Sequence, residues 1–264
     1  MTIPGRAPSL GEAAAYDKAA ITQTLAQCAL LKGLSDQEVA EVAELAHARA
    51  FPAQTDIFAE GEPCRALWIL ASGRVRLYHS AADGRQQVVS FRSPVMSLEL
   101  GPALDGRAFT ATATALDDVV MVIIPRATLL TIEQRFPTTV RNVIDQLCQE
   151  LRQRDISTAV ASLKDARGRI GCALLQLAFQ YGAPSGNGLR IAYRLTRQDV
   201  ADISGVTLET AIRALSDMQR QGIIRTQAQI IEIVDVDGLR GPTQCDDCQF
   251  DCSVFVPSRR NGTH

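Results

Sequence analysis

The sequence lacks the segments that would tie it to a membrane. No apolar run approaches the roughly 18 residues of a bilayer span. The first residues, MTIPGRAPSLGEAAAYDK, lack the basic flank and apolar core of a secretory signal. The chain has 264 residues, 46% hydrophobic and 21% charged, which is ordinary for one or two globular domains. We therefore expect a cytoplasmic protein with no membrane partner.

Histidine is scarce, with three residues in the whole chain. Only His79 lies in the segment that we predict as a β-rich domain, and it stands beside a hairpin turn, where a histidine is usually solvated. A metalloenzyme of cupin type needs several His and carboxylate ligands inside its barrel, so it is a remote alternative. Haem is disfavoured for the same reason. We expect no enzymatic activity.

The chain also lacks an overall excess of basic residues, since its net charge is −2. The charge is distributed unevenly, because residues 164–234 hold nine Lys or Arg and six Asp or Glu. This segment is therefore +3, which is compatible with binding nucleic acid through a few phosphate contacts.

The first half of the chain predicts two helices and then a β-rich domain. The helices are expected over residues 21–31 and 36–48, the second capped by Ser35 with Glu38 in a capping box. Short β runs then follow between residues 50 and 125, namely LWIL, RVRLYH, QQVVSF, ATATAL and VVMVII. Turns at Gly61, Gly73, Asp83-Gly84 and Asp105-Gly106 separate them, which is typical of a sandwich or roll.

A long helix is predicted next, from about Ile132 or Pro137 to Leu163. Its apolar seam is spaced near 3.5 residues and consists of Val140, Ile144, Leu147, Leu151, Val160 and Leu163. The seam could pack on the helix's own roll. We favour pairing with a second copy of the chain, because two-fold dimers suit two half-sites on DNA. A third helix, residues 166–181, is expected to lead through a loop, GAPSGNG, into the next domain.

Residues 195–222, LTRQDVADISGVTLETAIRALSDMQRQG, predict two helices joined by a tight turn. Thr196 with Asp199 can cap the first helix, and Thr207 can cap the second. Gly205 accepts the left-handed backbone that the turn needs, and Gly222 follows the second helix. The run IIRTQAQIIEIV after it predicts the hairpin of a winged helix.

The second of these helices has a polar face made of Glu209, Arg213, Ser216 and Arg220. It could be an ordinary surface helix with a Glu–Arg pair. We favour DNA recognition, in which Arg213 donates to guanine O6 and N7 and Glu209 accepts from cytosine N4. The predicted DNA-contacting residues are Arg197, Thr207, Leu208, Glu209, Ile212, Arg213 and Ser216.

The seven cysteines, an odd number, argue against a disulfide framework. Cys28, Cys64, Cys148 and Cys172 lie among apolar neighbours and are predicted to be small core residues. Cys245, Cys248 and Cys252 form a C-x2-C-x3-C cluster whose thiolates can reach three corners of a metal site. An iron–sulfur cluster, a zinc ion with a fourth ligand, and no metal at all remain open at this point.

Together these features predict an α+β protein. It comprises an N-terminal tail (1–20), a double-stranded β-roll of jelly-roll type (21–131), a dimerisation helix (132–163), a winged helix-turn-helix domain (164–236) and a cysteine-containing extension (237–264). This order resembles the cyclic-AMP receptor protein and fumarate-nitrate-reduction regulator (CRP/FNR) family of bacterial transcription factors. The resemblance covers about residues 25–236. Its most specific segments are LKGLSDQEV, EGEPCRALWILASGRVRLY, ELG at 99–101 and LTRQDVADISGVTLETAIRAL.

The resemblance implies a homodimer that binds a palindromic operator in double-stranded DNA, with RNA polymerase as a further partner. In the family the recognition helix reads each half-site through the positions of Glu209 and Arg213, and both residue types match. Ile212 departs from the small polar residue of the oxygen-responsive branch.

The resemblance also bears on the effector. Family members that bind cyclic nucleotides hold the ribose with a Glu and the phosphate with an Arg–Ser pair, and here Glu99 and Thr110 match the Glu and the Ser. Phe109 replaces the Arg and Leu98 replaces a flanking glycine, so cyclic AMP is not expected. Arg107 is expected on the opposite face of a strand.

Oxygen-sensing relatives carry a cysteine-rich segment, which implies an iron–sulfur cluster, [4Fe-4S], on Cys245, Cys248 and Cys252, with zinc as the alternative metal. Cys148 or Asp155 is the candidate for the fourth ligand; His264 is a remote option, and Asp165 is expected to cap the next helix. The predicted function is a DNA-binding regulator controlled by redox state, oxygen or nitric oxide. In the alternative, a small molecule other than cyclic AMP binds the roll, and the C-terminus holds zinc or no metal.

Overall fold

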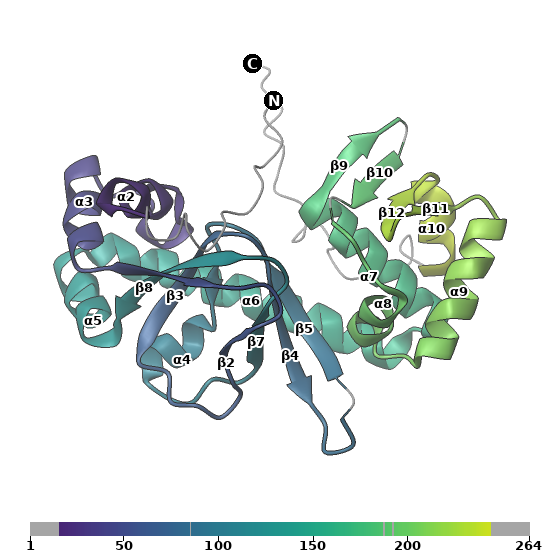
Figure 1. Cartoon of the computed structure of the whole chain (residues 1–264), viewed down its shortest axis with the longest axis horizontal. Coiled ribbons are helices and arrows are strands. Elements are labelled where there is room, and N and C mark those ends of the chain that lie inside the picture. The colour runs from purple at the N-terminus through teal and green to yellow at the C-terminus, as the bar shows by residue number, and fades with distance from the viewer. Residues whose placement is uncertain (1–15, 85, 187, 192, 244–264) are drawn as a thin grey trace. The chain divides into compact units, whose positions relative to one another are not determined.

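The structure is a computed structural model, and it describes residues 16–84, 86–186, 188–191 and 193–243. The chain divides into two compact units, with the division between Cys148 and Gln149 (Figure 1). The predicted fold class is confirmed: a β-roll comes first, a long helix follows, and a winged helix-turn-helix comes last. In the part of the chain that the structure describes, no helix combines the length and apolar character that a bilayer crossing requires.

The first unit begins with α2 (Lys18–Gln27), the short 3-10 helix η1 (Ala29–Leu31) and α3 (Asp36–Glu44). The single helix predicted over 21–31 is therefore broken at Cys28, whose backbone is extended. The capping box at Ser35 is confirmed: Ser35 Oγ accepts from the Glu38 amide, and the Glu38 carboxylate accepts from the Ser35 amide at 2.7 Å.

The second predicted helix ends earlier than expected, at Glu44 rather than Ala48. Residues His47–Phe51 form strand β1, which pairs with the strand Val119–Pro125 some 70 residues later, His47 lying opposite Ile123. Pairing with a distant strand overrides local helix propensity here. His47 is therefore a second histidine in the roll, and the expectation that only His79 lies there is wrong.

The roll consists of two four-stranded antiparallel sheets, ordered β1-β8-β3-β6 and β2-β7-β4-β5. The remaining strands of the roll are β2 (Asp56–Phe58), β3 (Ala66–Ser72), β4 (Val75–Ser80), β5 (Gln86–Arg92), β6 (Ser97–Leu98), β7 (Thr112–Ala115) and β8 (Val119–Pro125). The five predicted strands all form. Strands β1, β2 and β6 and the short helix α4 (Leu100–Asp105) were not predicted.

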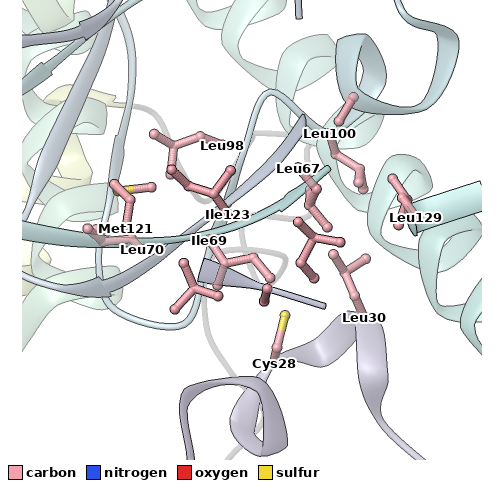
Figure 2. Close-up of a cluster of buried hydrophobic side chains, with 14 of the residues drawn as sticks. Cys28, Leu30, Leu67, Ile69, Leu70, Leu98, Leu100, Met121, Ile123 and Leu129 are labelled. Carbon is pink, nitrogen blue, oxygen red and sulfur yellow. The ribbon is translucent and has the colours of Figure 1, made fainter. Parts of the chain in front are cut away.

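The centre of the roll is strand β8, in which every residue from Val119 to Ile124 is buried. A strand buried on both faces needs a cover over its sheet, and the buried residues of η1 and α5 (Arg126–Arg135) belong to the same core. Figure 2 shows Leu30 of η1 and Leu129 of α5 near strand residues such as Leu67 and Ile69, and these four side chains line one small cavity.

The cysteines of the described residues differ in burial. Cys28 lies in the core and points towards the strand residues (Figure 2). Burial raises the pKa of its thiol to about 11, and burial also raises the pKa of Cys64. Both are structural thiols, as predicted. Cys148 is exposed and Cys172 is only partly buried, so the prediction that all four are core residues is wrong for Cys148.

A single long helix, α6 (Pro137–Leu163), links the roll to the second unit. It begins at Pro137 and not at Ile132, because Ile132 belongs to α5 and Phe136 separates α5 from α6. In the first unit, the Asn142 amide of α6 donates to the Leu30 and Lys32 carbonyls, and Gln146 Nε2 donates to Ser97 Oγ.

The second unit contains α7 (Ala166–Tyr181), β9 (Gly182–Ser185), β10 (Gly188–Ile191), α8 (Arg197–Ser204), α9 (Leu208–Arg220), β11 (Ile224–Gln227), β12 (Ile230–Ile233) and α10 (Val236–Thr243). Its sheet runs β11-β12-β10-β9. The segment GAPSGNG, expected to be a loop, supplies β9 and the first residue of β10. These two strands pair with each other (Leu189 opposite Pro184), and β10 also pairs with β12 (Leu189 opposite Ile233). Helix α10 packs on α7 through the fully buried Leu239.

The turn between β3 and β4 depends on Gly73, which has φ +82°. A Cβ there would lie 2.6 Å from the Asp118 carbonyl oxygen and 2.7 Å from Val119 Cγ1. We expect Gly73→Ala to lower the free energy of unfolding by about 3 kcal/mol, because backbone strain and overpacking add. Gly84→Ala is the matched control, since Gly84 has φ +83° but open space around its Cβ position. It should cost about 1 kcal/mol in urea unfolding, and equal losses would contradict the packing argument.

Candidate nucleic-acid interface

Helices α8 and α9 are joined by the turn that the sequence predicted. The Thr196 hydroxyl accepts from the Asp199 amide at 3.0 Å, and the Asp199 carboxylate accepts from the Thr196 amide, so the capping box is complete. Gly205 ends α8 with φ +61° and ψ +42°, the left-handed conformation that glycine adopts without strain. The Val206 amide donates to the Ala201 carbonyl and closes the turn.

Helix α9 is fixed at both ends and along one face. The Thr207 hydroxyl accepts from the Thr210 amide, and Gly222 follows the helix with φ +73°. The predicted core row is confirmed, since Ala211, Leu215 and Met218 are almost completely buried. Because a helix has 3.6 residues per turn, burying this row determines which side chains point outward.

The outward face carries charges that are largely exposed to solvent. Arg213 Nη2 lies 3.4 Å from Glu209 Oε1, an exposed i,i+4 pair. At the far end of α9, Arg220 pairs with Asp217, and Ser216 Oγ donates to the Ile212 carbonyl at 2.8 Å. An exposed ion pair adds little to stability, so Glu209 and Arg213 are free to exchange partners at small cost.

Most of the predicted DNA-contacting residues are exposed, and all but Arg197 lie on α9 or at its N-cap. Arg197 is exposed at the first residue of α8, and Thr207, Leu208, Glu209, Ile212 and Arg213 are exposed on the first turns of α9. Ser216 is half-buried, one turn further along. A helix N-terminus with outward amides and this set of side chains suits the major groove and its phosphates.

The wing adds cationic and structural residues that sequence reasoning missed. Strands β11 and β12 form an antiparallel hairpin around Ala228 and Gln229, both with positive φ. Arg225 on β11 is largely exposed and lies 3.5 Å from Glu232. On α7, Arg167 Nη2 donates to Gln221 Oε1, which fastens the end of α9. Arg225 could have been noted as a wing cation, but no local signal predicts the contact of Arg167.

The roll contains the residues that the resemblance assigned to a cyclic nucleotide. Glu99 is buried at φ +48°, and its Oε2 accepts from the Thr110 amide at 2.8 Å and from the Thr110 hydroxyl at 2.5 Å. The carboxylate and hydroxyl that a ribose and phosphate would contact thus hydrogen-bond to each other.

Phe109 is part of the aromatic core of the roll. Its ring stacks on Phe58 with centroids 3.7 Å apart and planes 8° apart, and Phe58 contacts Trp68. Leu98 is fully buried on β6 (Figure 2). Arg107 does not lie on a strand as expected: it stands in the loop before β7, exposed, with Nε 3.6 Å from Asp105.

The predicted metal ligands Cys245, Cys248 and Cys252, and also His264, lie outside the described residues. Among the residues that are described, no three His, Cys, Asp or Glu side chains come together to hold a metal. The two candidates for a fourth ligand, Cys148 and Asp155, are both exposed on α6. Asp165 caps α7 as predicted, accepting from the Gly168 amide at 2.7 Å.

Comparison with known proteins agrees with this architecture. Residues 48–136 match the cyclic nucleotide-binding domain family, and residues 168–241 match the Crp-like helix-turn-helix domain family. The CRP-like cAMP-activated global transcriptional regulator of Mycobacterium tuberculosis is 29% identical over 82% of this chain and 97% of its own length. The nitrogen fixation regulation protein FixK of Azorhizobium caulinodans is 26% identical, over 74% of this chain and 79% of that protein.

Among solved structures, FixK2 from Bradyrhizobium japonicum is similar with a TM-score of 0.67 and 26% identity, covering 74% of this chain and 96% of that one. The matched domains follow each other in the order that the fold shows, with α6 between them. The chain therefore belongs to the CRP/FNR family and is a DNA-binding transcription regulator of that type.

Proposed function

We propose that this regulator binds a palindromic operator as a homodimer, with α9 in the major groove, and that an iron–sulfur cluster on the C-terminal cysteines controls binding. The observation that carries the DNA-reading part is the exposed Glu209–Arg213 pair on a helix that is capped and buried along its other face. On DNA the pair opens: Arg213 donates to guanine O6 and N7, and Glu209 accepts from cytosine N4.

The role of Arg213 can be tested on DNA. We expect Arg213→Ala to weaken binding by about 1–3 kcal/mol and to relax the preference for one guanine, because a bidentate contact is lost. Binding is measured by fluorescence anisotropy on the preferred duplex and on single-base variants. Arg220→Ala is the control, since Arg220 is equally exposed but lies at the far end of α9. A loss that is the same on every duplex would mean that Arg213 touches phosphate only.

The dimer is proposed from the surface of α6. Val140, Ile144 and Leu151 on this helix are 40%, 47% and 61% exposed, which is unusual for three large apolar residues at heptad-like spacing. We call these three residues the apolar strip of α6; exposed apolar residues at this spacing on one helix are typical of a protein–protein interface. Pairing α6 with its copy buries the strip, and a two-fold axis then supplies two recognition helices for two half-sites.

A charge in this strip should separate the protomers. We expect Ile144→Asp to convert the protein to a monomer, measured by light scattering after size-exclusion chromatography, and to abolish tight operator binding. Leu45→Asp is the matched control, because Leu45 is 52% exposed but lies at the end of α3. A variant at Ile144 that remained dimeric would place the interface elsewhere.

For the roll, we propose that cyclic AMP is not the effector, although the Mycobacterium tuberculosis relative is named for it. Phe109 offers no charge for a phosphate and is stacked in the core, while Glu99 is held by Thr110. We expect millimolar cyclic AMP to leave the melting temperature and the DNA affinity unchanged. The same titration of that relative provides the positive control. A saturable rise in melting temperature would show binding to the folded state and overturn this proposal.

The iron–sulfur proposal rests on donor chemistry. Cys28 and Cys64 are buried thiols with raised pKa values, and the described residues hold no three-ligand group. We therefore assign the cluster to Cys245, Cys248 and Cys252, whose close spacing suits one site, with Cys148 or Asp155 as the candidate for the fourth ligand. When bound, the cluster supplies a group sensitive to oxygen and nitric oxide. The aspartates at 246, 247 and 251 add negative charge and make its reduction harder.

Protein purified without air should contain iron and sulfide and absorb near 400 nm (roughly, for thiolate–iron charge transfer). We expect replacement of any one of Cys245, Cys248 or Cys252 by Ser to remove this absorbance and to change DNA affinity. Cys172→Ser should do neither. If the anaerobic protein is colourless and holds about one zinc per chain, the cluster proposal is wrong and the cysteines form a structural zinc site. It would also favour the alternative of a small-molecule effector in the roll.

A further inference from the structure

Two large apolar residues on α9 are not accounted for by the packing of the second unit. Leu208 is 42% exposed and Ile212 is 39% exposed, whereas the inward face of the helix is already filled by Ala211, Leu215 and Met218. Ile is also a weaker helix former than Ala, Glu or Lys, so neither local propensity nor core packing explains Ile212 at this position. Surface exposure of Ile212 costs hydration free energy that a contact on DNA would recover.

Ile212 lies beside the polar row that is proposed to read bases. On a helix, residues three and four apart are neighbours, so Ile212 stands next to Glu209 and Leu208 on one side and Ser216 on the other. The hydroxyl of Ser216 donates to the Ile212 carbonyl at 2.8 Å, so its proton is directed to the helix backbone. The surface around Ile212 therefore presents an apolar strip of Leu208 and Ile212 alongside the Glu209–Arg213 pair.

We propose that Ile212, supported by Leu208, reads the C5-methyl group of a thymine in a base pair adjacent to the guanine that Arg213 is proposed to contact. This inference rests on the proposed role of α9 in the major groove. The thymine methyl is the apolar group that base edges present there, and apolar side chains contact it.

The same contact selects against the other bases. Cytosine and adenine place an amino group in the major groove, and guanine places a carbonyl oxygen there. Covering one of these groups with the Ile212 side chain removes its water without supplying a hydrogen bond, which is unfavourable. Ile212 thus combines an attractive contact with thymine and a penalty for its competitors, as specific recognition requires.

The test removes the methyl group alone. Full-length protein first selects duplexes from a random-sequence library, and each thymine of the selected half-site is then replaced in turn by deoxyuridine. One such replacement should weaken binding of the native protein about fourfold, the value of one buried methyl group. Ile212→Ala should bind the thymine duplex more weakly and show no further loss with deoxyuridine at that position. The native discrimination against cytosine at that position should also shrink.

Val234→Ala is the matched control, because Val234 is also 39% exposed but lies beyond β12, outside α9. It should keep the full deoxyuridine effect. Equal melting temperatures for the three proteins would exclude misfolding as the cause. The inference is overturned if no deoxyuridine weakens the native protein, or if native protein and Ile212→Ala lose the same factor. If Arg213→Ala loses its preference for guanine, the proposed role of α9 is supported whether or not Ile212 contacts a thymine methyl group.

Discussion

The burial of one row of side chains on α9 is the constraint on which DNA reading depends. Ala211, Leu215 and Met218 have almost no exposed surface, and they hold the helix in one rotation about its axis. Since the helical period is fixed, the same contacts set Glu209, Ile212 and Arg213 outward together. The caps at either end limit fraying of the helix, on which the residues proposed to read bases lie. The orientation of the proposed recognition face thus depends on residues that are buried in the second unit.

The roll has the architecture of a cyclic nucleotide-binding domain, but an aromatic side chain occupies the position of the phosphate-binding Arg. Most of the two sheets and helix α5 lie in the segment that matches the cyclic nucleotide-binding domain, and the family resemblance assigned Glu99 to a ribose contact. Phe109, however, stacks on Phe58, which in turn contacts Trp68. These aromatic contacts stabilise the core of the roll, and the Phe109 ring offers no polar group to a ligand. The domain keeps the shape of a receptor, while the chemistry for holding a phosphate is replaced. This is why we propose that the C-terminal cysteines control DNA binding.

The sequence alone predicted those parts of the protein whose signals are local. Thr196 with Asp199, Gly205 and Thr207 identified the helix-turn-helix almost to the residue, because caps and left-handed turns are decided within four residues. The β11–β12 hairpin and the five main strands of the roll also followed from short β-branched runs and glycine turns. The family resemblance came from the same local segments, and it agreed with the roles that residue chemistry had already predicted for Glu209 and Arg213.

The tertiary structure decided whatever depends on partners distant in sequence. His47–Phe51 is a strand because β8 pairs with it, and β9 and β10 are strands because they pair with each other and β10 also pairs with β12. Exposure also depends on distant segments. The sequence cannot assign the side chains of Cys148 and Ile144 to core or surface, and in the fold both are exposed. Local propensity is a few tenths of a kcal/mol per residue, so strand pairing and burial between distant segments override it.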